Sequence, residues 1–105
     1  MQERVLDKEK VKRDLVSALS GDEAVEKVVI FGSFVTSDVP HDLDIAIFCT
    51  STADYLTLAM AYRRKLREIA RDIPIDLLPI TSSHDPESCF LQEINKGETI
   101  YEKRH

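Results

Sequence analysis

Residues 28–33, Val-Val-Ile-Phe-Gly-Ser, and residues 42–48, Asp-Leu-Asp-Ile-Ala-Ile-Phe, decide the fold of this chain. Each stretch contains an apolar run with the composition of a buried β-strand. The first run ends abruptly at Gly32-Ser33, and the second opens with two carboxylates, Asp42 and Asp44. The pattern therefore predicts a glycine–serine turn at the end of one strand and a pair of acids at the mouth of the next.

The two acids have the spacing of a shared site. Side chains at i and i+2 of a strand point to the same face, so Asp42 and Asp44 should lie side by side. Two ionised carboxylates repel at that distance unless a cation lies between them. Oxygen ligands suit Mg²⁺ or Mn²⁺, which complete their coordination with water and substrate phosphates. Asp76, inside the apolar run 75–78, is the third candidate, either as a metal ligand or as a general base.

The glycine–serine pair is suited to phosphate. Gly32 has no Cβ and lets the backbone approach a ligand closely. The N–H groups that follow it, with the hydroxyl of Ser33, would point at phosphate oxygens. Plainer interpretations stay open: a tight turn for Gly32-Ser33, a solvated loop for Asp42 and Asp44, and an edge-strand carboxylate in water for Asp76.

Gly-Ser, then Asp-x-Asp at the start of a strand, then a lone Asp on a later strand resembles the nucleotidyltransferases of the DNA polymerase β superfamily. The short chain is similar to the minimal nucleotidyltransferases that are encoded beside helical HEPN proteins. The resemblance covers residues 25–80 and, more loosely, the whole chain. At residues 34–37 this chain reads Phe-Val-Thr-Ser, where many members carry an Arg-Gly pair, and it has His41 where many have serine.

The resemblance implies an α/β (α+β) fold, a small mixed sheet with helices packed on it. It also implies transfer of a nucleoside monophosphate, AMP from ATP, to a hydroxyl group, with Mg²⁺ or Mn²⁺ and release of pyrophosphate. Asp42, Asp44 and Asp76 would be the catalytic metal ligands, and Gly32 and Ser33 would bind the nucleotide phosphates. The acceptor platform would come from a second copy or from a HEPN-type protein, with this chain as the antitoxin.

Two other functions remain open on the sequence alone. One is a catalytically weak binding module that neutralises its partner by occlusion, and the other is a domain that senses a nucleotide or metal. A basic helical stripe of Arg63, Arg67 and Arg71 is either a solvated face or a docking surface for an acidic partner or a phosphate-bearing substrate.

Length and composition limit the number of domains and the classes of ligand that this chain can bind. The 105 residues predict a single domain over 1–105. The net charge of −5 argues against binding of nucleic acid by this chain alone, but it does not exclude binding of a single nucleotide. No apolar run has the length of a membrane span, and the N-terminus lacks the apolar stretch of a signal peptide. Cys49 and Cys89 lack metal-type spacing, as expected of reduced thiols in the cytoplasm.

Periodicity predicts the remaining elements. The helix expected after the second strand opens with a capping box over Ser51–Asp54 and buries a stripe of Tyr55, Ala59, Tyr62, Leu66 and Ile69. A short helical turn is expected after Ser33. The helices are expected at residues 3–20, from about 55 to 71, and at 86–95, and the strands at 26–31, 43–49, 75–80 and 99–102.

Overall fold

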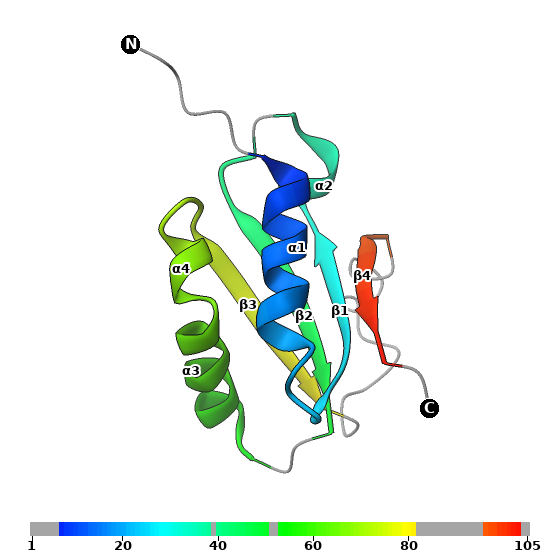
Figure 1. The fold of residues 1–105 in the computed structure, drawn as a ribbon, viewed down its shortest axis with the longest axis vertical. Helices are drawn as coiled ribbons and strands as arrows, with labels where there is room; N and C mark the ends of the chain where they lie inside the picture. Colours follow the sequence, from blue (N-terminus) through cyan, green and yellow to red (C-terminus); the bar gives the residue numbers. More distant parts are fainter. Residues whose placement is uncertain (1–6, 39, 51–52, 82–95, 104–105) are drawn as a thin grey trace.

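The computed structural model describes residues 7–38, 40–50, 53–81 and 96–103. Helices and strands follow one another along this part of the chain in the order α1 (Lys8–Leu19), β1 (Val25–Phe31), α2 (Ser33–Thr36), β2 (Leu43–Cys49), α3 (Tyr55–Lys65), α4 (Arg67–Ala70), β3 (Ile75–Thr81) and β4 (Glu98–Glu102) (Figure 1). Within the described residues, every helix is too short or too polar to span a bilayer.

The four described strands form one mixed sheet in the order β3-β2-β1-β4. β1 runs antiparallel to both β2 and β4, whereas β2 and β3 are parallel. A parallel pair needs a crossover connection, and α3 and α4 provide it. The expected α+β architecture, a small mixed sheet with helices packed on it, is confirmed.

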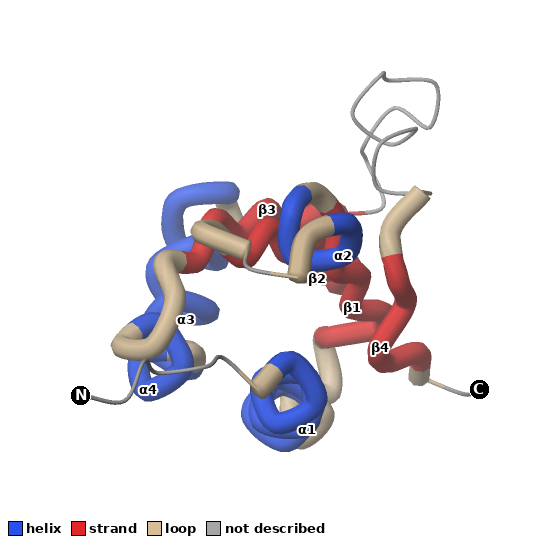
Figure 2. The backbone as a smooth tube through the Cα atoms, turned by 90° about the horizontal axis from the view of Figure 1, so that it is seen from above, coloured by secondary structure: helices blue, strands red, loops and turns tan. Residues whose placement is uncertain are grey.

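The helices α1, α3 and α4 cover one face of the sheet (Figure 2). The main hydrophobic core lies between them and the strands. Alternate strand residues supply the sheet side of this core, among them Val28, Ile30, Leu43, Ile45, Ile47 and Leu77. The residues between them face the other way and form a smaller cluster of Val29, Ala46 and Ile80, with Phe31, Phe48 and Leu78 against it.

The predicted strands match the structure to within one residue at each end. The short helical turn expected after Ser33 is present as α2. The first helix is present from Lys8, with Asp7 as its N-cap: the side chain of Asp7 accepts a hydrogen bond from Lys10 N at 3.2 Å. The helix predicted at 86–95 lies outside the described residues, as does the start of the first helix at 3–6.

The helix between β2 and β3 differs from its prediction in three ways. Asp54, rather than Ser51, is the N-cap, and its carboxylate accepts a hydrogen bond from Thr57 N at 2.8 Å. The helix is interrupted at Leu66, whose φ and ψ of −100° and 12° separate α3 from α4. The predicted stripe is buried except for Tyr55, which is 57% exposed because it stands in the first turn, before the helix reaches the core.

Candidate functional site

Three strand ends meet at one end of the sheet, the upper end in Figure 1. β1 finishes there at Phe31, and both β2 and β3 begin there. In the register of the sheet, Asp44 is paired with Phe31 on one side and with Asp76 on the other. The N–H group of Leu43 donates a hydrogen bond to the carbonyl oxygen of Pro74 at 2.9 Å, which ties the start of β2 to the start of β3. The turn after β1 and two of the predicted acids are thereby brought into one place.

Asp44 and Asp76 lie on the sheet face that α1, α3 and α4 leave uncovered. Leu43 and Ile45 point into the main core, so Asp44 between them points to the opposite face. Leu77 fixes the direction of Asp76 in the same way. Asp44 is half-buried at this face, whereas Asp42 and Asp76 are exposed.

The charges of the three acids are coupled at Asp44. Partial burial raises the pKa of the Asp44 carboxyl above its usual value, and the carboxylates of Asp76 and Asp42 raise that pKa further. Asp76 and Asp42 are therefore each close enough to Asp44 for like-charge repulsion. A bound cation would remove this repulsion and favour the ionised forms.

Gly32 lies directly against the Asp44 carboxylate. Its φ of 75° and ψ of −151° fall in a region that residues with a Cβ rarely adopt. A Cβ added at Gly32 would lie 2.3 Å from Asp44 Oδ2. Glycine is needed here both for the turn and for the approach of the backbone to Asp44.

α2 continues from this glycine and carries Ser33 at its start. The turn is closed by hydrogen bonds from Val35 N to Gly32 O at 3.1 Å and from Ser37 N to Ser33 O at 2.8 Å. The ring of Phe34 is 1% exposed and anchors the turn in the main core. Ser33 itself is exposed, so its hydroxyl and the first N–H groups of the turn are accessible at the end of β1.

The donor set fits a hard divalent cation. Among the described residues, no group of three or more His, Cys, Asp or Glu side chains is arranged to hold a metal ion by itself. Mg²⁺ commonly takes only one or two protein carboxylates and completes its shell with water and substrate phosphates. Asp44 with Asp42 or Asp76 would suffice for such a site, and the accessible turn at Gly32-Ser33 leaves room for the phosphates.

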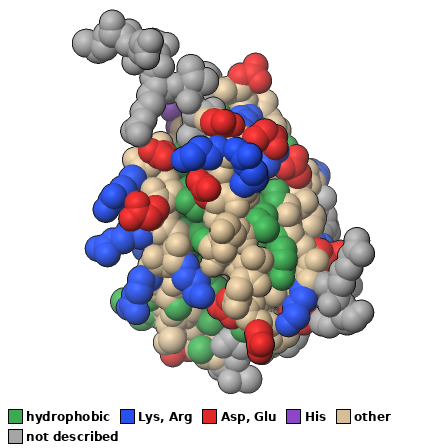
Figure 3. Space-filling view, in the orientation of Figure 1, with side chains coloured by type: hydrophobic (Ala, Val, Ile, Leu, Met, Phe, Trp, Pro, Cys, Tyr) green, Lys and Arg blue, Asp and Glu red, His purple; other side chains and the backbone are tan. Residues whose placement is uncertain are grey.

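The basic stripe is not part of this site. The three arginines are exposed in the layer that covers the other face of the sheet: Arg63 is on α3, Arg67 begins α4, and Arg71 is the C-cap of α4. Figure 3 shows Lys and Arg side chains gathered along the edge of the molecule where these helices lie. Arg71 is paired with Glu68 at 3.3 Å. His41, just before the acids, is exposed.

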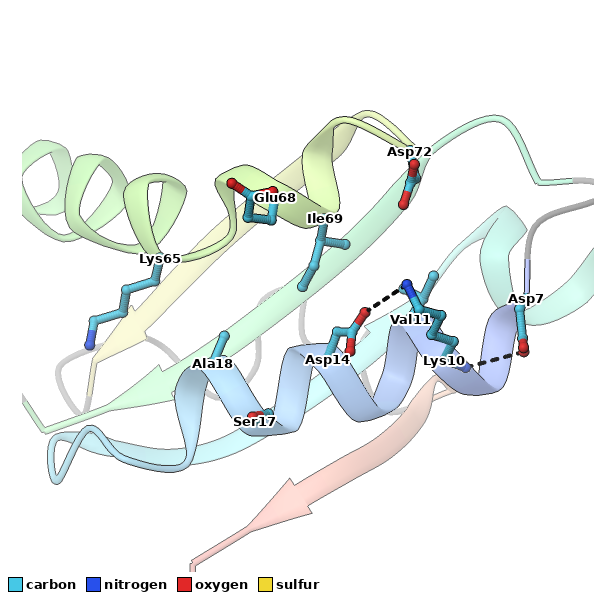
Figure 4. Close-up of a pocket in the computed structure, with 10 residues that line it drawn as sticks. All are labelled: Asp7, Lys10, Val11, Asp14, Ser17, Ala18, Lys65, Glu68, Ile69 and Asp72. Atoms are coloured by element: carbon cyan, nitrogen blue, oxygen red, sulfur yellow. Dashed lines mark hydrogen bonds and ion pairs between the residues drawn. The ribbon is translucent and has the colours of Figure 1, made fainter. Parts of the chain in front are cut away.

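A groove between α1 and α4 was not predicted from the sequence (Figure 4). Its volume is about 690 Å³, and Val11, Ala18 and Ile69 contribute apolar surface to it. An ion pair of 3.6 Å between Lys10 and Asp14 lies along its α1 side. The groove depends on the separation of two helices that are distant in sequence, so no local pattern could have indicated it. It lies in the helical layer, across the sheet from the acids.

Comparison with known proteins identifies a family. The family model described as polymerase beta, nucleotidyltransferase matches residues 13–105. Among curated proteins, none matches this chain with statistical significance.

Solved structures share the fold. A chain in the complex of tri-AMPylated Shewanella oneidensis HEPN toxin with MNT antitoxin superposes with a TM-score of 0.68 at 16% identity, over 92% of this chain and 74% of that one. The toxin–antitoxin MntA-HepT gives 0.65 at 15% identity, over 90% and 73%. A toxin–antitoxin with AMP-PNP gives 0.65 at 19% identity, over 89% and 74%. Since the family model extends over most of the sequence, this chain belongs to the polymerase β nucleotidyltransferase family.

Proposed function

We propose that this protein transfers AMP from ATP to a hydroxyl group of a HEPN-type partner protein and acts as its antitoxin, with Mg²⁺ or Mn²⁺ as cofactor. The observation that carries the proposal is the register of the sheet, which pairs Asp44 with Asp76 while Gly32 lies against the Asp44 carboxylate. A phosphate-compatible turn and coupled carboxylates thus adjoin one another in a member of a nucleotidyltransferase family.

Each residue has a distinct role in the proposed reaction. The backbone at Gly32 and the hydroxyl of Ser33 would hold the β- and γ-phosphates. Asp42 and Asp44 would hold the metal–triphosphate, where the bound ion supplies positive charge against the phosphates and the pyrophosphate leaving group. Asp76 would prepare the acceptor hydroxyl in one of two ways: it would take the proton itself as general base, or it would help to hold an ion that lowers the pKa of that hydroxyl so that water takes the proton. The acceptor oxygen forms a bond to the α-phosphorus, the bond from that phosphorus to the bridging oxygen breaks, and pyrophosphate leaves.

The proposed partner rests on the solved structures of similar fold. One of them holds a tri-AMPylated HEPN toxin with an MNT antitoxin. The site of this chain is exposed at one end of the sheet, with Asp42, Asp76 and Ser33 all accessible. A hydroxyl on the surface of another protein could therefore reach it without entering a deep cavity.

The test is a transfer assay with purified proteins. A candidate HEPN-type partner protein is incubated with this chain, Mg²⁺ and ATP labelled at the α-phosphate, and the protein-bound label is measured. We expect label on the partner with the wild-type chain and none with Asp44→Asn. Label that appears equally with Asp44→Asn, or no label while the toxin is still neutralised, would refute the proposed chemistry.

Occlusion of the partner without catalysis is a second candidate, because α3 presents an apolar surface on which a partner could dock. Tyr55, Leu56 and Met60 are 57%, 67% and 55% exposed, and apolar side chains grouped in this way are typical of an interaction site. The two functions separate in cells that express the toxin. Asp44→Asn should abolish protection if AMP transfer neutralises the toxin and should leave protection intact if occlusion does.

A further inference from the structure

The short helix α2 carries no charge of its own to stabilise its C-terminal end. It has no basic residue in its last turn, and three of its four residues are exposed. The last carbonyl groups of a helix have no partner within the helix, and a nearby cation stabilises them. For α2 that cation comes from another element, α1.

Lys8 is the first residue of α1, where the helix dipole disfavours a cation. Its side chain is nevertheless half-buried, because it reaches across to α2. The Nζ group donates a hydrogen bond to the carbonyl oxygen of Ser37, the C-cap of α2. The same Nζ lies 5.4 Å from the centre of the Phe34 ring, within range of a cation–π interaction. Lys8 thus contacts α2 at two residues.

We propose that Lys8 is a positioning residue that holds α2 in place and thereby keeps Gly32 against Asp44 and Ser33 beside it in sequence at the end of β1. Residues 32 and 33 lead directly into α2, so a shift of this helix moves them relative to β2. A displacement of about 1 Å takes a hydroxyl out of hydrogen-bond range of a phosphate oxygen. The consequence for nucleotide binding rests on the proposed function, whereas the anchoring of α2 does not.

Hydrogen exchange tests the anchor without any nucleotide. The amides of Val35 and Ser37 close the turn of α2, so their exchange reports its opening. Lys8→Met keeps the length of the side chain but removes its charge, and it should speed exchange of both amides about tenfold, the scale for losing one charge-assisted hydrogen bond. Lys10→Met, an exposed lysine of the same helix, should leave both rates unchanged. Equal rates in Lys8→Met and the wild type, or unprotected amides in the wild type, would overturn the anchor.

Nucleotide affinity tests the positioning role. The dissociation constant of Mg²⁺ with a non-hydrolysable ATP analogue is measured by calorimetry for the wild type, Lys8→Met, Lys8→Arg and Lys10→Met. We expect about tenfold weaker binding in Lys8→Met alone, because arginine can also donate to Ser37 and lie over Phe34. Equal weakening in both Lys8 variants, with a lower melting temperature, would mean general destabilisation instead of positioning. No binding by the wild type, with the exchange result as expected, would refute the proposed function and leave the anchor in place.

Discussion

The contact between Gly32 and Asp44 leads to the sharpest prediction, because replacing one hydrogen atom by a methyl group should separate folding from function. In Gly32→Ala the new Cβ would lie 2.3 Å from Asp44 Oδ2, far inside van der Waals contact. The φ of 75° and ψ of −151° at this position are in addition strained for alanine. The substitution therefore has two separable effects on the protein. One, the backbone term, is the conformational strain at residue 32, and the other, the contact term, is the clash with the Asp44 carboxylate.

The backbone term should mainly lower stability, whereas the contact term should mainly lower the affinity for MgATP. The backbone term should cost about 1–3 kcal/mol of folding free energy, the usual range for a residue held in such a region. For a domain of this size, each kcal/mol lowers the melting temperature by about 4–8 °C. The contact term should cost less stability, because the clashing atom ends a side chain that can rotate away. That rotation moves the Asp44 carboxylate from its site, so affinity for MgATP should fall about 10- to 100-fold, the range for disturbing the support of a metal ligand.

Thermal melting and calorimetric titration with MgATP measure the two terms on the same samples. Gly21→Ala is the matched control, since no atom lies within 4 Å of a Cβ built there and its φ is not positive. In an Asp44→Ala background, Gly32→Ala should still lower the melting temperature, because the backbone term remains after the contact is removed. If Gly32→Ala melts and binds MgATP as Gly21→Ala does, the close approach of Gly32 to Asp44 has no part in the site.

Three further predictions follow from the same geometry. Asp44→Asn should leave the melting temperature of the apo protein unchanged or raise it, because it removes like-charge repulsion. The same variant should lose MgATP binding in calorimetry, and a marked fall in its melting temperature would instead make Asp44 a structural residue. Asp76→Asn should bind MgATP within a few-fold of wild type but transfer AMP at least ~10²-fold more slowly in single-turnover assays, and transfer at the wild-type rate would remove Asp76 from the mechanism. Gly97→Ala should lower the free energy of unfolding by about 1–3 kcal/mol, because its Cβ would lie 2.3 Å from the backbone oxygen of Ile30, which cannot rotate away. Thermal melting measures this loss, and an unchanged melting curve would contradict the contact.

Local sequence signals predicted the strands well because each apolar run is bounded by residues that end it. Gly32 closes β1, and Asp42 stands just before β2. The start of α3 was predicted less well because Ser51 and Asp54 are both competent N-caps. The choice between them depends on where the chain leaves the sheet. Backbone hydrogen bonding continues past the end of β2 to Thr50, whose N–H donates to the carbonyl oxygen of Ala24, just before β1, at 2.9 Å. The interruption at Leu66 has no glycine or proline to mark it.

The candidate site was predictable in composition but only partly in geometry. The i, i+2 spacing predicts Asp42 and Asp44 on one face without any knowledge of the fold, although β2 begins only at Leu43. The position of Asp76 opposite Asp44 could not be predicted in the same way, because β3 follows β2 only after the crossover through α3 and α4. The contacts of Lys8 with residues 34 and 37 could not be predicted from the sequence either, because they join two helices that are separated by a strand.

The hydrophobic core is what fixes the register on which the site depends. Leu77 is 7% exposed and belongs to the main core, and Asp76 before it faces the opposite side of the sheet. A slip of β3 by one residue would reverse every side chain of the strand and turn Asp76 into that core. Burying an unpaired carboxylate there, and exposing Leu77, would both be costly. The apolar residues of β3 therefore do more than stabilise the fold: by excluding the slipped register they hold Asp76 beside Asp44.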